Sequence, residues 1–198
     1  MTMPGVATAA VPLGEPEPAL VAWYERLSAA LADELPAAVQ LRHRLHADPR
    51  LSGDEQDTTD AVVAALGLDG GRPVAGTGRL VRVVDGPGSA VALRAELDGL
   101  AVAEATGVPW ASTGDVMHAC GHDAHLAGLV ALARAVARVG GPAPLVVLLQ
   151  PREERAPSGA ADVVASGVLT QERVDCVVAA HVQPQLACLL YTSPSPRD

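Results

Sequence analysis

The chain has 198 residues, of which 49% are hydrophobic, so it can form one ordinary domain with a sizeable core. Fourteen basic residues, all of them Arg, against 23 acidic ones give a net charge of −9, which excludes the basic surface of a nucleic-acid-binding protein. No apolar run is long enough to span a bilayer, and the three cysteines lack the pairing of a disulfide framework. We therefore expect a cytoplasmic protein with neither nucleic-acid nor membrane partners.

Helices are predicted in the first part of the chain. Residues 1–19 mix Pro, Gly, Ala and Thr without a period, and we expect a flexible N-terminal extension there. A helical pattern follows over 20–35. It is expected to break at Pro36 and to resume over 37–47, because proline lacks the N–H that an interior helical residue donates. A second helix is expected over 54–66.

The hydrophobic pattern then becomes strand-like. Short apolar runs predict strands, and the amphipathic segments between them predict helices. The expected strands are 80–84, 89–95, 145–149 and 176–180, and the expected helices are 124–139 and 162–166. Strands that alternate with helices predict an α/β fold, a three-layer sandwich with a largely parallel central sheet.

Chemically active side chains follow three of the predicted strands. Asp98 comes after the second strand, Glu153 and Glu154 come after the third, and His181 comes directly after the fourth. In open α/β sheets, ligands bind beyond the carboxyl ends of the strands. We therefore expect these side chains to gather at one edge of the sheet.

The segment 118–125 (HACGHDAH) adds a cysteine and three histidines at a loop-to-helix junction. Taken alone, Cys120 would be a small buried residue, the two glutamates a solvated loop, and His181 a structural histidine. Together they are the ligand types that divalent transition metals take. Their convergence favours a metal site, in which one of two adjacent glutamates binds metal and the other faces the bound water.

Three more residues are candidates for a supporting role around such a site. Asp98 and Asp123 have no nearby cation in the sequence, and either is suited to orient a ligating histidine. His118, at the start of the same segment, is a third candidate for this outer position.

Other histidines and cysteines have simpler interpretations. His43 and His46 lie among arginines on the first helical segment, where we expect a solvated, basic helix face. Cys176 lies inside an apolar run and is expected to be a core residue. None of the three is assigned to the metal site.

Six segments occur in an order that resembles a known family. They are LRHRLHADPRLSGDE (41–55), VALRAELDGL (91–100), TGVPW (106–110), VMHACGHDAH (116–125), QPREE (150–154) and VDCVVAAHV (174–182). Together they are similar to the aminoacylase/carboxypeptidase-type metallopeptidases, in the amidohydrolase branch that includes hippurate hydrolase and the indoleacetyl-amino-acid hydrolases. The most specific motif is MHACGHDAH.

The resemblance implies a dinuclear metal centre. Cys120 and His122 match the ligand pair of the CGH motif, and Glu154 matches a metal-binding glutamate. His181 matches the histidine that completes the ligands from this part of the chain, and Glu153 matches the general base. The implied cofactors are two divalent ions, Mn or Zn, with the Cys120 thiolate able to bridge them.

The implied reaction is hydrolysis of the amide bond of a small N-acyl amino acid. Two divalent ions lower the pKa of a bridging water, and Glu153 takes its proton and later passes it to the leaving amine. The resemblance also implies that residues 20–187 are the N-terminal part of the catalytic domain. A lid or dimerisation domain and one more metal-binding histidine are expected further along, and a homodimer is implied for the full-length protein.

The last residues do not fit this pattern. Residues 188–198 (CLLYTSPSPRD) resemble the translation of a sequencing-library adapter, and we expect a non-native tail there. The expectation is therefore an N-terminal fragment that hydrolyses N-acyl amino acids poorly by itself.

The sequence departs from the family pattern near the site. Glu96 stands where Asp is usual, and Arg152 stands where Ala is usual. Neither change removes an implied ligand. Arg152 lies next to the implied base, so it is the departure that could alter activity.

Three other functions stay open at this point. One is a dipeptidase or carboxypeptidase of the same fold. Another is a hydrolase with Cys120 as nucleophile and His122 or His125 as base. The third is a non-catalytic, metal-binding fragment.

Overall fold

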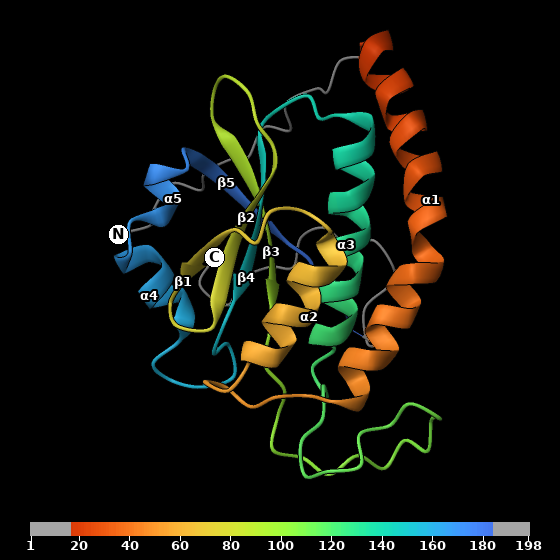
Figure 1. The fold of residues 1–198 in the computed structure, drawn as a ribbon, viewed down its shortest axis with the longest axis vertical. Helices are drawn as coiled ribbons and strands as arrows, with labels where there is room; N and C mark the ends of the chain where they lie inside the picture. The colour runs from red at the N-terminus through yellow and green to blue at the C-terminus, as the bar shows by residue number, and fades with distance from the viewer. Residues whose placement is uncertain (1–16, 184–198) are drawn as a thin grey trace, which may run out of the picture.

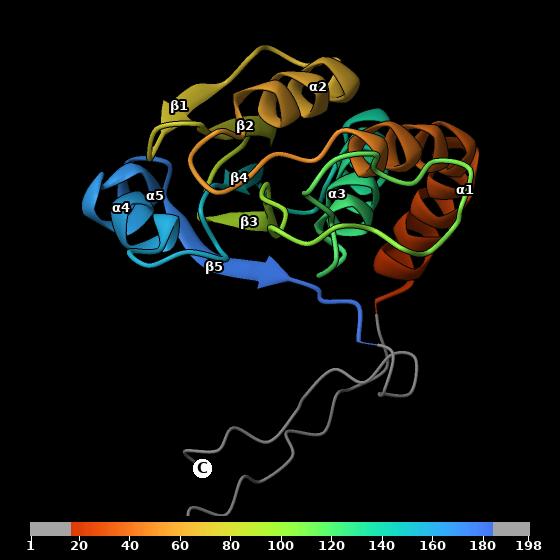
Figure 2. The same cartoon turned by 90° about the horizontal axis from the view of Figure 1, so that it is seen from below.

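The computed structural model describes residues 17–183, which form three layers (Figures 1 and 2). Three helices cover one face of a sheet, and two short helices lie against the other. The helices are α1 (Pro18–Ala47), α2 (Gln56–Leu66), α3 (His122–Val139), α4 (Gly159–Ala165) and α5 (Val168–Gln171), and the strands are β1 (Arg72–Val74), β2 (Gly78–Val84), β3 (Ala90–Glu96), β4 (Leu145–Gln150) and β5 (Val174–Ala179). The predicted three-layer α/β architecture is confirmed.

The strand order in the described residues is β1-β2-β4-β3-β5. β3 pairs in parallel with both β4 and β5, whereas β2 runs antiparallel to its neighbours β1 and β4. All strands except β2 therefore point the same way, so the sheet is largely parallel, as predicted. The carboxyl ends of β3, β4 and β5 meet at one edge.

Aliphatic side chains fill both spaces between the layers. β4 is buried along its whole length, as expected for a central strand with helices on both faces. The larger core lies between the sheet and α1, α2 and α3, and it includes Leu41, Val62, Leu97, Leu126 and Leu149. A smaller core lies under α4 and α5 and includes Val146, Leu148, Val163 and Val168.

The predicted elements agree with the structure to within a few residues. α2 ends at Leu66, where Gly67 adopts a left-handed conformation with φ of 66° that terminates the helix. Two elements were not predicted, namely the three-residue strand β1 and the four-residue helix α5. Both are too short to show a hydrophobic period, so sequence pattern alone could not identify them.

Pro36 does not break the first helix, and the prediction there was wrong. α1 runs without interruption through Pro36, whose side chain is exposed. The opposite side of α1 packs against α3 through residues such as Leu27, Ala30 and Ala38. This packing on both sides of Pro36 compensates for the hydrogen bond that proline cannot donate.

Cys176 is also not where it was expected. It is exposed, because β5 is the edge strand of the described sheet and almost all of its residues are accessible. An apolar run at the edge of a sheet looks the same in sequence as one at its centre.

The described part of the chain leaves some predictions untested. The expected extension 1–19 falls largely on residues outside the described range, although α1 already begins at Pro18. The predicted tail 188–198 lies entirely outside that range. Within residues 17–183, no helix is long and apolar enough to cross a membrane.

We predict that Pro36→Ala stabilises the protein. Alanine restores the N–H that residue 36 of α1 donates to the carbonyl of Ala32, and it removes the clash of the proline ring with that turn. Urea denaturation should show a free energy of unfolding higher by about 1–3 kcal/mol. As a control, Pro87→Ala in the exposed bend between β2 and β3 should give no such gain. An unchanged or lower stability for Pro36→Ala would contradict the prediction.

Candidate metal centre

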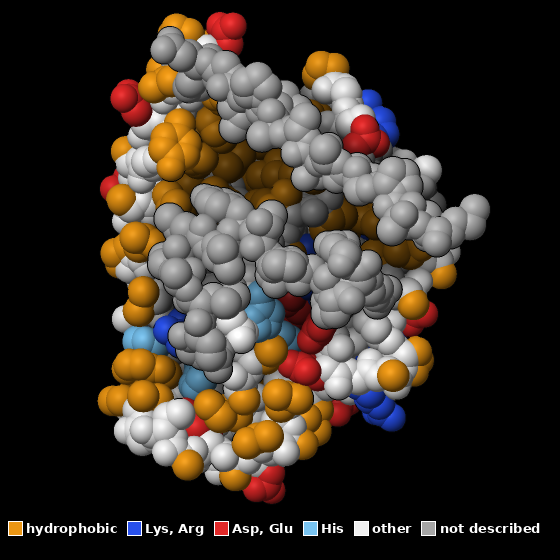
Figure 3. Space-filling view, turned by 180° about the vertical axis from the view of Figure 1, so that it is seen from behind, with side chains coloured by type: hydrophobic (Ala, Val, Ile, Leu, Met, Phe, Trp, Pro, Cys, Tyr) orange, Lys and Arg blue, Asp and Glu red, His pale blue; other side chains and the backbone are white. Residues whose placement is uncertain are grey.

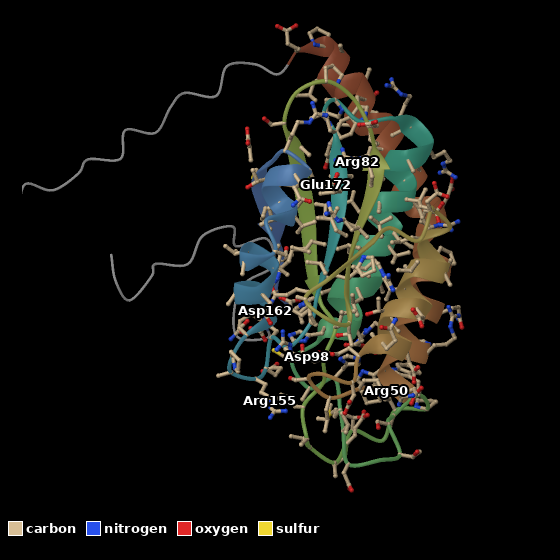
Figure 4. The ribbon with its side chains drawn as sticks, turned by 60° about the vertical axis from the view of Figure 1, so that its left-hand side comes forward. Arg50, Arg82, Asp98, Arg155, Asp162 and Glu172 are labelled. Carbon is tan, nitrogen blue, oxygen red and sulfur yellow. The ribbon has the colours of Figure 1, made fainter. Side chains whose placement is uncertain are left out.

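The edge formed by the carboxyl ends of β3, β4 and β5 collects the predicted site residues. Asp98 follows β3, and Figure 4 shows it at the end of the sheet opposite to Arg82 and Glu172. Glu153 and Glu154 follow β4, and His181 follows β5. Histidine and acidic side chains gather on one face of the molecule (Figure 3).

Cys120, His122 and His181 form a compact group. One ligand atom of each lies within 4.8 Å of those of the other two, and the Cys120 Sγ is 3.2 Å from the His181 Nε2. Gly121 permits this approach, because it adopts a φ of 89° and a Cβ there would collide with Val182. Residues separated by about sixty positions in the chain thus lie side by side.

Hydrogen bonds set the orientation of both histidine rings. His122 Nδ1 lies 2.8 Å from the backbone carbonyl oxygen of Asp98, and His181 Nδ1 lies 2.7 Å from that of Val182. A carbonyl only accepts, so in each ring Nδ1 carries the proton and Nε2 keeps its lone pair. Metal-ligating histidines usually donate their other N–H in this way.

Glu153 and Glu154 also approach His122 Nε2. One carboxylate oxygen of each is 3.7 Å from that nitrogen. The Glu153 side chain is 38% exposed, whereas that of Glu154 is 20% exposed. The more accessible carboxylate is therefore the one predicted to act as base, and the more buried one is the predicted ligand.

Asp98 holds the Glu154 segment in place. Its Oδ2 accepts hydrogen bonds from the Glu154 backbone N–H at 2.9 Å and from the Ser52 hydroxyl at 2.5 Å. It orients His122 through its backbone carbonyl, while its carboxylate Oδ1 lies 3.7 Å from His122 Nδ1. Asp98 was expected to orient a ligating histidine. It contacts His122 through its backbone carbonyl, whereas its carboxylate accepts the backbone N–H of Glu154.

The buried polar atoms at this edge suit a divalent cation. His122 Nε2 and Glu154 Oε1 are both buried, and neither has a hydrogen-bond partner among residues 17–183. An unpaired carboxylate oxygen facing an imidazole lone pair is costly without a cation between them. With a thiol, two imidazoles and two carboxylates, the residues present fit zinc or manganese.

The Cys120 thiol is protonated in the metal-free protein. Burial raises its pKa to about 11, a hydrogen bond to Glu154 adds to the shift, and so do the negative charges of Glu154, Glu153 and Glu96. A cation at this position would reverse the shift, since a coordinating thiol loses its proton.

Glu96 and His125 form a second pair beside the first group. His125 Nδ1 is 2.9 Å from a Glu96 carboxylate oxygen, and Glu96 also forms an ion pair with Arg94. Burial opposes ionisation of Glu96, but the His125 hydrogen bond and the Arg94 charge lower its pKa to about 2. Sequence reasoning noticed both residues but missed their pairing, which joins positions 29 residues apart.

Glu55 supports the loop after β4 and was also missed. It is completely buried, and its carboxylate accepts hydrogen bonds from the Arg152 backbone N–H at 2.8 Å and from the Thr77 hydroxyl at 2.7 Å. At the start of α2, such a residue looks like an ordinary N-terminal acid. The Arg152 side chain forms an ion pair with Asp162.

His46 and His43 are not on a solvated helix face, so that prediction was wrong. His46 is buried and lies 3.0 Å from an Asp123 oxygen and 3.1 Å from a Glu104 oxygen. His43 is half-buried and stacks on Trp110, with ring centroids 3.8 Å apart. The loop between β3 and α3 covers this part of α1, and local sequence carries no sign of that contact.

Asp123 and His118 are both buried, like the metal candidate His122. Asp123 is fully buried and one of its oxygens accepts from Arg42 at 3.0 Å and contacts His46. His118 is buried, neither of its ring nitrogens has a partner in the described part of the chain, and burial lowers its pKa to about 4. Neither ring nor carboxylate shows a hydrogen bond to His122 or His181 that would orient a ligand.

Comparison with known proteins places these residues in a family. Residues 92–188 match peptidase family M20/M25/M40. N-acetyl-L-cysteine deacetylase from Bacillus subtilis (strain 168) is 36% identical over 156 residues, which cover 75% of this chain and 37% of that protein. A protein from Rhodococcus jostii (strain RHA1) that is named glutamate–cysteine ligase 2-3 is 41% identical over 152 residues. These residues cover 75% of this chain but only 19% of that protein.

Solved structures agree with this assignment. A dinuclear metal binding peptidase of the M20 family from Bacillus subtilis matches with a TM-score of 0.70 and 31% identity, covering 78% of this chain and 45% of that one. The chain spans less than half of the length of the relatives to which it is similar. Residues 92–188 therefore belong to a domain of peptidase family M20/M25/M40.

Proposed function

We propose that the protein is a metal-dependent amidohydrolase that cleaves the amide bond of small N-acyl amino acids. The observation that carries this proposal is the convergence of Cys120, His122 and His181 within 4.8 Å, with Glu153 and Glu154 facing the same His122 nitrogen. The similarity to a deacetylase of N-acetyl-L-cysteine supports an N-acyl amino acid as the substrate class.

Four side chains would hold the metal, namely Cys120, His122, Glu154 and His181. Divalent ions bound there would act as Lewis acids that polarise the amide carbonyl and acidify water. Glu153 is the more exposed carboxylate, and we assign it the role of general base, which takes a proton from the attacking water and returns it to the leaving amine. The Asp98 carboxylate keeps Glu154 in place by accepting the backbone N–H of Glu154.

The compartment is part of the proposal. A Cys120 ligand has to stay reduced, and Cys120 is a free thiol in the structure. A reducing compartment such as the cytoplasm preserves it.

Substitutions of the two adjacent glutamates should have different effects on the metal content of the chain. Glu154→Gln removes a ligand charge, so the purified chain should lose bound Zn²⁺ or Mn²⁺, measured by elemental analysis after dialysis. Glu153→Gln should keep nearly the full metal content, because that carboxylate is assigned to proton transfer. The wild-type chain is assayed for release of free amino acid from N-acyl substrates. Any such release should stop in Glu153→Gln, and it should also stop when a chelator removes the metal.

The opposite pattern of metal content in these two variants would reverse the assigned roles. Release that continues in the presence of a chelator but stops after thiol alkylation would instead favour the hydrolase with Cys120 as nucleophile.

The raised pKa of Cys120 gives a separate prediction for the metal-free chain. A pKa of about 11 leaves only about one thiolate per thousand thiols at pH 8, so iodoacetamide should alkylate Cys120 slowly there. The rate should rise about tenfold per pH unit up to about pH 11, because only the thiolate reacts. Peptide mass spectrometry can follow Cys120 separately from the other cysteines.

Glu154→Gln serves as the control, since it removes a negative charge that raises the pKa, and it should accelerate alkylation at pH 8. A wild-type rate that already reaches its plateau near neutral pH would contradict this account and would indicate an activated nucleophile.

A further inference from the structure

Both ring nitrogens of His125 are engaged in hydrogen bonds. Nδ1 is 2.9 Å from a Glu96 oxygen, and Nε2 is 3.0 Å from the backbone nitrogen of Val182. A backbone N–H can only donate, so Nε2 must accept and the ring proton must sit on Nδ1, from which it is donated to Glu96. His125 is therefore fixed as one tautomer by Glu96 at the end of β3 and by Val182 in the segment after β5.

Glu96 is itself held firmly at the end of β3. Its carboxylate is almost fully buried and is paired with Arg94, whose Nε donates to the Gln150 side chain at 2.9 Å. A chain of polar contacts thus runs from β4 through β3 to His125 on α3. The acceptor that fixes the His125 proton is consequently rigid.

The other end of this chain holds the segment that carries His181. Val182 directly follows His181, and its N–H donates to His125. This segment lies beyond the end of β5, the exposed edge strand. The His125 and His181 ring centroids are 4.8 Å apart, so the two rings are neighbours.

We propose that His125 is a positioning residue that holds the segment 181–182 against α3 and thereby keeps the His181 Nε2 beside the Cys120 Sγ. This inference rests on the proposed metal centre, because its consequence is a preformed pair of ligands. It assigns a role to a histidine that is not counted among the metal ligands.

The geometry distinguishes positioning from metal binding by His125 itself. Ligand atoms of Glu96, His122 and His125 also lie within 4.8 Å of one another, so the three could in principle surround an ion. His125, however, would have to break one of its two hydrogen bonds to offer a lone pair, whereas His122 Nε2 has no hydrogen-bond partner within the described range. If His125 is a ligand, removing its ring should lower the number of ions bound per chain. If His125 only positions the segment 181–182, that number should stay the same.

The test uses Co²⁺ titration of the purified 198-residue chain, followed by the absorption band that arises when a cysteine thiolate binds cobalt. His125→Phe keeps a ring but removes both hydrogen bonds, and it should weaken the apparent Co²⁺ affinity by about 10–100-fold while the ions bound at saturation stay the same in number. His125→Gln can still donate to Glu96 and accept from Val182, and it should retain most of the wild-type affinity.

His43→Phe is the matched control, since it replaces a histidine that stacks on Trp110 away from the site, and its affinity should equal that of the wild type. Unchanged affinity in His125→Phe would overturn the proposal. The loss of one ion per chain in both His125 variants would also overturn it and would make His125 a ligand.

A second measurement needs no variant and no metal. Long-range ¹H–¹⁵N NMR of the metal-free chain should show His125 with its proton on Nδ1, and a proton on Nε2 would overturn the proposal. If the wild-type chain shows no thiolate–cobalt band, the proposed metal centre fails, while this NMR result still tests the two hydrogen bonds by which His125 holds the segment 181–182.

Discussion

The candidate site depends on the parallel alignment of β3, β4 and β5. In this register Glu96 lies opposite Gln150, and Arg94 lies opposite Ala179, so the three strands end at nearly the same level. The segments that leave them therefore begin side by side, and they carry the carboxylates and His181. α3 begins at the same edge with His122. A shift of one strand by a residue would turn its side chains to the other face and separate these groups.

A common hydrogen-bonding pattern prepares the histidines at this edge. In His122 and His181 the Nδ1 proton is donated to a backbone carbonyl, and in His125 it is donated to Glu96. His122 and His181 thereby offer an Nε2 lone pair to the centre of the site. The Nε2 lone pair of His125 instead accepts the backbone N–H of Val182. Fixed tautomers reduce the reorganisation that metal binding would require.

The sequence predicts the architecture well because the architecture depends on local patterns. Short apolar runs identify β2 to β5, and the rule that ligands bind beyond strand ends predicts that Asp98, Glu153, Glu154 and His181 lie at one edge of the sheet. What it misses are contacts between distant segments. His46 is buried by a loop near position 104, and Glu55 supports a loop near position 152, in each case across more than fifty residues. Pro36 likewise stays helical only because α3 packs against α1.

The central claim is that Cys120 and the surrounding imidazoles and carboxylates bind the same metal, and X-ray absorption of the zinc-loaded chain tests it most directly. The account predicts a sulfur scatterer at about 2.3 Å from zinc together with nitrogen or oxygen scatterers at about 2.0–2.2 Å. The sulfur signal should disappear in Cys120→Ser and persist in Cys176→Ser, whose thiol is exposed on β5. A zinc environment of nitrogen and oxygen alone in the wild-type chain, or a sulfur signal that survives Cys120→Ser, would contradict the account.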